Sequence, residues 1–268
     1  MCYSADVATL RVDDVELFYE ERGSGSPLVF LHGLGSSTRD WKFQLEHFSP
    51  RFRCVAFDLP GSGRSKDLGH PHGPFTLAGF AKALAGGMKQ LGLAPAHVVG
   101  LSMGGMTGLQ LALDAPEVVR TLTVVNAGAS VIASTFKERL LLGVRALVTK
   151  TMGPRGVAKL VAPRLFPRAD QKDLRDTFIA QMADNEPRTY AAVSRALMGW
   201  TVEERVGALK CPVLFVAADQ DYTPLSMKEA LARRIPGAKV VVIPNSHHAV
   251  PVECPQAFNA VLEAALAS

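Results

Sequence analysis

A serine lies at the centre of Gly100-Leu101-Ser102-Met103-Gly104, a G-x-S-x-G segment flanked by two apolar stretches. Between a strand and a helix, this pattern makes a sharp turn that exposes the serine hydroxyl, and the N-terminus of the following helix favours negative charge nearby. The chemistry that suits such a serine is nucleophilic attack on an acyl group. The same five residues also fit an ordinary glycine-rich turn, so the interpretation depends on partners elsewhere in the chain.

A serine nucleophile needs a base to take its proton and a carboxylate to orient that base. Both are present near the end of the chain. Asp219 and Asp221 follow one late apolar run, and His247 and His248 follow the next. Each pair leaves two alternatives for the role, because spacing along the chain alone does not choose between neighbours.

The elements that must position these residues alternate along most of the chain. Continuous apolar runs indicate strands buried on both faces, and they are separated by helical patterns, which predicts an α/β fold with a doubly wound, mostly parallel sheet. Sites in such sheets form where strands end, so the serine, acid and histidine loops should meet at one edge. The predicted strands are two in 7–20, then 27–31, 52–57, 97–99, 121–126, 213–217 and 239–243, and the predicted helices are 41–48, 76–91, 105–114 and 256–266.

This alternation stops in the middle of the chain. Residues 129–208 contain amphipathic stretches punctuated by Pro154, Pro163, Pro167 and Pro187, which predicts several helices without strands. We therefore expect a core made of residues 1–128 and 209–268, with 129–208 inserted as a helical cap.

Taken together, the motifs resemble the α/β-hydrolase superfamily over nearly the whole chain, including its order of serine, acid and histidine. The motifs are His32-Gly33, the Asp58-x-Pro-Gly-x-Gly-x-Ser65 loop, the serine segment, Asp221-Tyr-Thr-Pro224, and His248 followed by Glu253 and Pro255. One departure is Ala218, which stands where the family frequently has a glycine in the acid loop.

The resemblance implies roles for individual residues. Family spacing favours Asp221 over Asp219 as the acid and His248 over His247 as the base. The oxyanion hole would be formed by the backbone N–H groups of Met103, the residue after the nucleophile, and Leu34.

Other positions are candidates for the surroundings of the site. His32 and Gly33 would lie at the substrate pocket, with His32 bracing its loop by hydrogen bonds, and Asp58 would tie down the glycine-rich loop. Met152, Met198 and Trp200 could line an apolar acyl pocket or could simply pack the cap.

The predicted function is a serine hydrolase of small to medium carboxylic esters that works through an acyl-enzyme intermediate. No metal or organic cofactor is required, because the protein supplies the nucleophile, base and oxyanion donors. The alternatives are a lactonase or enol-lactonase, a carbon–carbon bond hydrolase, and a ligand-sensing homologue that turns over slowly. A carboxylate-nucleophile reaction is disfavoured, because Ser102 occupies the elbow.

The composition of the chain limits the kinds of binding partner that we expect. The net charge of +4 resides in residues 128–208, where thirteen lysine and arginine residues face eight acidic ones without a consecutive basic run. We expect a solvated basic surface and no nucleic-acid or membrane partner. No secretory signal is recognisable and the four cysteines lack metal or disulfide spacing, so a cytoplasmic protein with reduced thiols is expected, as a monomer or small homo-oligomer.

Overall fold

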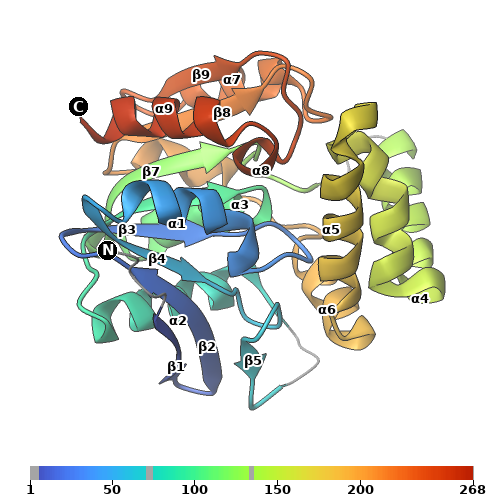
Figure 1. Cartoon of the computed structure of the whole chain (residues 1–268), viewed down its shortest axis with the longest axis horizontal. Helices are drawn as coiled ribbons and strands as arrows, with labels where there is room; N and C mark the ends of the chain where they lie inside the picture. The colour runs from blue at the N-terminus through green and yellow to red at the C-terminus, as the bar shows by residue number, and fades with distance from the viewer. Residues whose placement is uncertain (1–5, 71–74, 133–135, 268) are drawn as a thin grey trace.

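The computed structural model describes residues 6–70, 75–132 and 136–267, within which nine strands form one sheet (Figure 1). The strand order is β1-β2-β4-β3-β6-β7-β8-β9, with β5 paired to β2. All neighbours from β4 to β9 in this order are parallel, whereas the pairs of β2 are antiparallel. The predicted doubly wound, mostly parallel sheet is confirmed. The strands are β1 (Asp6–Val12), β2 (Val15–Arg22), β3 (Ser26–Leu31), β4 (Phe52–Phe57), β5 (Lys66–Asp67), β6 (Ala96–Leu101), β7 (Val119–Val125), β8 (Val213–Ala218) and β9 (Lys239–Ile243).

Helices cover both faces of this sheet, which explains why its central strands are apolar throughout (Figure 1). Along β3, Leu28 and Phe30 enter one core cluster, while Val29 and Leu31 enter the other. This is the two-residue period of a strand, with both faces buried. The first cluster includes residues of α1 (Lys42–Phe48) and α9 (Pro255–Leu266), and the second includes residues of α2 (Leu77–Gln90), α3 (Met103–Asp114) and α7 (Leu225–Arg233).

Strand register brings the carboxyl ends of the central strands to one edge. Leu101 of β6 pairs with Val125 of β7, which pairs with Val216 of β8, and Ala218 pairs with Ile243 of β9. The loops that follow β6, β7, β8 and β9 therefore leave the sheet side by side.

Beyond this edge lie three helices of the middle segment, α4 (Phe136–Leu165), α5 (Lys172–Ala183) and α6 (Pro187–Ala196), seen at the right of Figure 1. Short helical turns make up the remaining elements: η1 (Thr38–Trp41), η2 (Pro116–Val118), η3 (Ala169–Gln171), η4 (Glu203–Ala208) and α8 (Val250–Glu253). An isolated β-bridge joins Ser130 to Thr201 where the segment leaves and rejoins the core.

One of the four prolines of the predicted cap, Pro163, does not separate helices as the sequence suggested, because it lies inside α4 near its end. Pro154 directly follows Gly153, which adopts φ 61° and ψ −174° and divides α4 into two helical halves. Glycine allows this backbone conformation, and a proline directly after the kink begins the second half of the helix at a position where its missing N–H costs little.

Three cysteines lie in the described residues and all are free thiols, whereas Cys2 lies outside them. Burial raises the pKa of the Cys54 thiol to about 12 and also raises the pKa of Cys211 and Cys254. These thiols are therefore poor nucleophiles at neutral pH. None of the helices described here is long and apolar enough to span a bilayer.

Candidate active site

Ser102 sits in the tight turn that joins β6 to α3, with φ 53° and ψ −115°. A positive φ is strained for a residue with a side chain, and its N–H is anchored to the carbonyl oxygen of Val125 at 2.9 Å. The flanking glycines are needed because a Cβ on Gly100 would lie 2.3 Å from the Gly104 oxygen, and one on Gly104 would lie 2.1 Å from the Leu31 oxygen. This is the geometry of a nucleophile elbow.

His248 and Asp221 meet at the same edge. Nδ1 of His248 lies 2.8 Å from Oδ1 of Asp221, whose side chain is fully buried. Burial alone would raise the pKa of this carboxyl, but the hydrogen bond and charge of His248, followed by hydrogen bonds from Lys228 and Thr223, outweigh it and lower the pKa to about 2. An ionised Asp221 accepts the Nδ1 proton, so Nε2 of His248 is the ring nitrogen that can act as an acceptor.

The two alternative residues have other partners. Asp219 accepts the backbone N–H groups of Asn245 and Ser246, at 3.0 and 3.1 Å, and so holds the loop that leads to the histidines. Burial opposes ionisation of Asp219, yet these backbone donors lower its pKa. His247 places Nδ1 2.9 Å from Glu253. The contact that a histidine base requires is thus made by Asp221 with His248.

Asn126, directly after β7, links the three loops. Its Nδ2 donates to the His248 carbonyl oxygen at 2.9 Å, and its Oδ1 accepts the N–H of Ala218 at 2.9 Å. Since the preceding residue, Val125, accepts the Ser102 N–H, the end of β7 fixes the serine, acid and histidine segments relative to one another. The sequence predicted Asn126 only as the last residue of a strand. The feature that could have indicated its role is an asparagine at a strand end, because asparagine tolerates a positive φ such as the observed 46°.

A second residue that the sequence did not reveal covers the histidine. The hydroxyl of Tyr222 lies 2.8 Å from Nε2 of His248, and the two rings stack with centroids 4.2 Å apart. Tyr222 itself is 58% exposed. In this state the phenol donates to the nitrogen that would receive the serine proton.

The loop after β3 approaches the serine from the other side. A Cβ on Gly33 would lie 3.6 Å from Cβ of Ser102, which places the Gly33–Leu34 backbone next to the nucleophile. Buried His32 braces this loop, because its Nε2 accepts the Leu59 N–H at 2.9 Å while Nδ1 donates to the Gly33 oxygen at 2.7 Å. His32 is thus committed to backbone partners.

Asp58 fixes the neighbouring glycine-rich loop. Its carboxylate is fully buried and accepts the N–H groups of Thr38 at 2.6 Å and Arg64 at 2.7 Å. A Cβ on Gly63 would lie 2.2 Å from Asp58 Oδ2, so the loop closes tightly over the carboxylate. The contacts are those of a turn residue.

The cap reaches the core through a few polar contacts. Gln171 donates to Glu253 Oε1 at 2.7 Å, and Asn185 donates to the Gly35 oxygen at 2.9 Å. Exposed Arg39 and Asp184 form an ion pair at 2.8 Å. The Leu34 side chain packs against the cap cluster that includes Met182 and Tyr190, so the cap lies directly over the predicted oxyanion loop.

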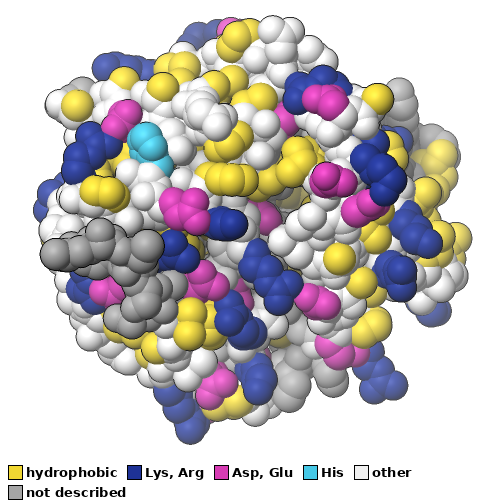
Figure 2. All heavy atoms as spheres, viewed as in Figure 1, with side chains coloured by type: hydrophobic (Ala, Val, Ile, Leu, Met, Phe, Trp, Pro, Cys, Tyr) yellow, Lys and Arg dark blue, Asp and Glu magenta, His cyan; other side chains and the backbone are white. Residues whose placement is uncertain are grey.

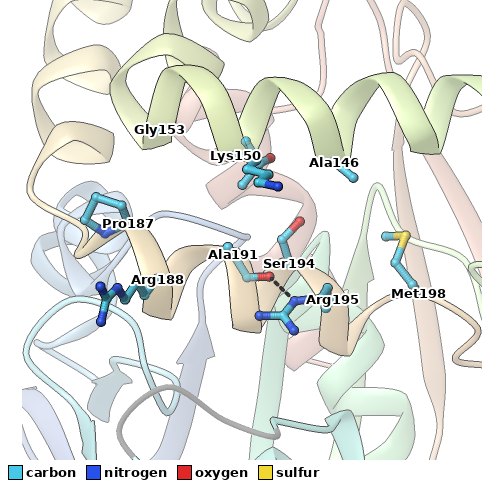
Figure 3. A pocket seen from close by; sticks show the side chains of 10 residues that line it. Ala146, Lys150, Gly153, Pro187, Arg188, Ala191, Ser194, Arg195 and Met198 are labelled. Atoms are coloured by element: carbon cyan, nitrogen blue, oxygen red, sulfur yellow. Dashed lines mark hydrogen bonds between the residues drawn. The ribbon is translucent and has the colours of Figure 1, made fainter.

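Between α4 and α6 the cap contains a cavity of about 600 Å³ (Figure 3). Its lining carries three cationic side chains and no carboxylate, and Arg195 donates to the Ala191 oxygen. The lining residues are Ala146, Thr149, Lys150, Gly153, Pro187, Arg188, Ala191, Ser194, Arg195 and Met198. On the face seen in Figure 2, by contrast, basic side chains are interspersed with acidic and apolar ones.

The three residues predicted to line an acyl pocket have different places. Met198 lines the cavity, whereas Met152 is 50% exposed on α4 and is not among the lining residues. Trp200 packs beside the main core cluster, and its indole N–H donates to Gln110 on α3 at 2.8 Å. Met198 and Trp200 both pack against the main core cluster, whereas Met152 lies apart from them.

Comparison with known proteins agrees with the fold. Residues 26–255 match a family model described as the alpha/beta hydrolase fold. The chain is 31% identical to "Putative carbamate hydrolase RutD" of Azorhizobium caulinodans, over 93% of this chain and 94% of the relative. It is 28% identical to 3-oxoadipate enol-lactonase 2 of Acinetobacter baylyi, over 96% of both chains. The crystal structure of the enol-lactonase from Burkholderia xenovorans LB400 superposes with a TM-score of 0.88 at 25% identity, over 97% of this chain and 100% of that one.

Proposed function

This chain belongs to the α/β-hydrolase family, and we propose that it is a serine hydrolase that cleaves small to medium carboxylic esters through an acyl-enzyme intermediate. In this proposal Ser102 is the nucleophile, His248 the base and Asp221 the acid. The observation that carries it is the 2.8 Å contact between His248 Nδ1 and Asp221, made at the sheet edge where Ser102 occupies its strained turn.

The reaction begins when Ser102 Oγ attacks the ester carbonyl carbon and Nε2 of His248 takes the hydroxyl proton. The tetrahedral oxyanion accepts hydrogen bonds from the backbone N–H groups of Leu34 and Met103, each donor being worth on the order of 10²–10³ in rate. The carbon–oxygen bond to the alcohol then breaks, and His248 returns its proton to that alcohol. Water repeats the attack on the acyl-enzyme with His248 again as the base, which releases the carboxylic acid and restores Ser102.

Tyr222 enters this scheme at its first step. Its hydroxyl donates to Nε2 of His248 in the resting state, so that hydrogen bond opens before the nitrogen accepts the serine proton. The exposure of the tyrosine, 58%, leaves its side chain room to move away.

The cavity between α4 and α6 is the proposed acyl-binding region. The helix α6, which lines it with Ala191 and Ser194, also reaches the oxyanion loop, because a Cβ on Gly35 would lie 2.9 Å from the ring of Tyr190. Its mixture of apolar and cationic side chains would accept an acyl chain and draw anionic substrates toward the opening.

A lactonase is the second candidate, favoured by the likeness to two proteins named as enol-lactonases. The same residues would open a cyclic ester, with the alcohol and acid products remaining in one molecule. The relative named as a carbamate hydrolase adds carbamates to the substrates worth testing.

Turnover of p-nitrophenyl acetate and butyrate, beside a panel of lactones and carbamates, tests the proposal. We expect many cycles per active site and, with a fluorophosphonate probe, a mass increase on the peptide that carries Ser102. A single burst without further turnover would favour the ligand-sensing alternative. Labelling of a different residue would contradict the assigned nucleophile.

A further inference from the structure

Lys228 of α7 buries its ammonium group beside the carboxylate of Asp221. The lysine side chain is 1% exposed, and its Nζ lies 2.6 Å from Asp221 Oδ2 and 2.9 Å from the Thr223 carbonyl oxygen. Lysine is almost never fully buried without a partner, because an ammonium group loses its hydration there. This lysine is therefore bound to the acid of the proposed triad.

The two oxygens of that carboxylate have different partners. Oδ1 contacts His248 Nδ1 at 2.8 Å, whereas Oδ2 accepts from Lys228 and from the hydroxyl of Thr223. A carboxylate held at both oxygens cannot rotate away from the imidazole. One negative charge also faces two groups, the ammonium that is already charged and the imidazole that becomes charged during catalysis.

We propose that Lys228 is a positioning residue that fixes the Asp221 carboxylate against His248 and, by sharing its negative charge, limits the strength of His248 as a base. This inference rests on the proposed function for its catalytic meaning. The electrostatic effect of Lys228 on His248 does not depend on the proposed function, because a nearby positive charge disfavours protonation of an imidazole whether or not an ester is present. The ammonium group of Lys228 thus competes with an imidazolium for the single negative charge of Asp221.

The other groups around His248 contact it without using the Lys228 ammonium group. Tyr222 lies on Nε2, and the Asn126 amide binds the His248 carbonyl oxygen. Other charged groups contact the same loop elsewhere. Asp219 accepts the N–H groups of Asn245 and Ser246. Glu253 contacts His247 and forms an ion pair with Arg168. A change at Lys228 thus alters a single charge among them.

The decisive variant is Lys228→Gln, because glutamine can still donate a hydrogen bond toward Asp221 but carries no charge. Lys228→Met removes both, and Lys228→Arg keeps the charge. Lys239→Gln, at an exposed lysine on β9, is the matched control. Two readouts are needed: the acidic limb of kcat/KM against pH with p-nitrophenyl acetate, and the ¹⁵N NMR titration of the His248 imidazole, assigned with His248→Gln.

We expect both the acidic limb and the imidazole titration to move to higher pH by on the order of one unit in Lys228→Gln and Lys228→Met. Lys228→Arg and Lys239→Gln should keep the wild-type midpoint. A lysine with a merely structural role would lower Tm without moving either midpoint. An unchanged or lowered midpoint in folded Lys228→Gln overturns the proposal. If no ester is hydrolysed, the proposed function fails, whereas the NMR titration still decides the role of Lys228.

Discussion

The sheet edge that carries the proposed catalytic residues and the predicted cap hold their polar side chains in different ways. At the edge, Asp221 and Lys228 are buried and each makes several hydrogen bonds. In the cap cavity, Lys150, Arg188 and Arg195 are exposed and pair with no carboxylate of the described residues. The first arrangement holds the polar atoms in fixed positions, and the second leaves long side chains free to adapt.

This difference follows from how each region is attached. Register between parallel strands places the ends of β6, β7, β8 and β9 together, and Asn126 ties their loops. The cap instead rests on the core through contacts such as Gln171 with Glu253 and Asn185 with Gly35. A rigid frame suits bond breaking, whereas an adaptable cover suits substrate selection. We therefore expect core variants to abolish turnover of every substrate and cap variants to change only preference.

The largest effect is expected for Ser102→Ala. Removing the hydroxyl removes the bond that the acyl group would form, so kcat should fall by about 10⁴-fold or more for every ester. We expect the variant to fold, because alanine is smaller than serine and the substitution removes no packing contact of the core. Steady-state kinetics beside thermal unfolding would check both parts.

Residual turnover within about tenfold of the wild type, in a folded Ser102→Ala protein, would remove the serine from the mechanism. It would also contradict the assignment of catalysis to the core and of substrate preference to the cap, since the reaction would then take place at another site.

Asp221→Asn comes next. The asparagine would no longer stabilise the imidazolium or fix its tautomer, so kcat should fall by on the order of 10³–10⁴-fold. The variant also leaves buried Lys228 without a counter-charge, which should lower the free energy of unfolding by about 3–5 kcal/mol. Kinetics and urea denaturation at pH 7 measure the two losses separately.

Asp219→Asn is the matched control for this variant. Its carboxylate accepts from backbone N–H groups, including those of Asn245 and Ser246, and Asp219 is exposed, so we expect less than a tenfold loss in kcat. The reverse order of the two losses would move the catalytic acid to Asp219.

Much of the core could be predicted from sequence because local chemistry and burial agree there. Only a glycine fits at positions 100 and 104, and runs such as 28–31 are apolar on both faces. The resemblance to the α/β-hydrolase family, and not the spacing alone, favoured Asp221 and His248, the pair that the structure places in contact. Lys228 could not be foreseen, because a lysine in a short amphipathic helix normally faces solvent. Only the path of the loop between β8 and α7 buries it.

The cap was less predictable because its helices have no strand register to fix them. The kink at Gly153 changes the direction of α4, so the sequence did not tell which methionine would face the cavity. Met198 lines it and Met152 does not. Tyr222 illustrates the same difficulty in a loop, since its stacking on His248 depends on tertiary geometry that residue type does not encode.

Acid stability should distinguish the buried carboxylate of the edge from those of the cap. The folded-state pKa of Asp221, about 2, lies below its unfolded value near 3.9, so ionised Asp221 stabilises the fold above about pH 4. This contribution, about 2.6 kcal/mol, is lost as the pH falls through the range from about 4 to 2 and below. Asp221→Asn should therefore show a weaker fall in stability over this range, measured by urea denaturation, and exposed Asp173→Asn in α5 should follow the wild type. Parallel curves for all three proteins would contradict the assignment.

Met198→Trp tests whether the cap selects substrates. A larger side chain in the cavity should lower kcat/KM for a long acyl ester by about tenfold relative to p-nitrophenyl acetate, since a few methylenes in an apolar site are worth this much. Met152→Trp, outside the cavity, should leave the ratio unchanged. An equal loss for every ester in a folded Met198→Trp protein would mean that the cap carries a catalytic group.

The smallest effect is expected at Tyr222, which belongs to the catalytic edge by sequence but is as exposed as the side chains of the cap. Tyr222→Phe keeps the ring stacked on His248 and removes the hydroxyl that donates to Nε2. Because a neutral hydrogen bond contributes a net 0.5–1.5 kcal/mol or so and must open before Ser102 is deprotonated, kcat/KM should rise by roughly two- to tenfold. Rates with p-nitrophenyl acetate across the pH range measure this change. A tenfold fall instead would mean that the phenol takes part in proton transfer, and the chemistry would then extend from the buried edge to an exposed residue.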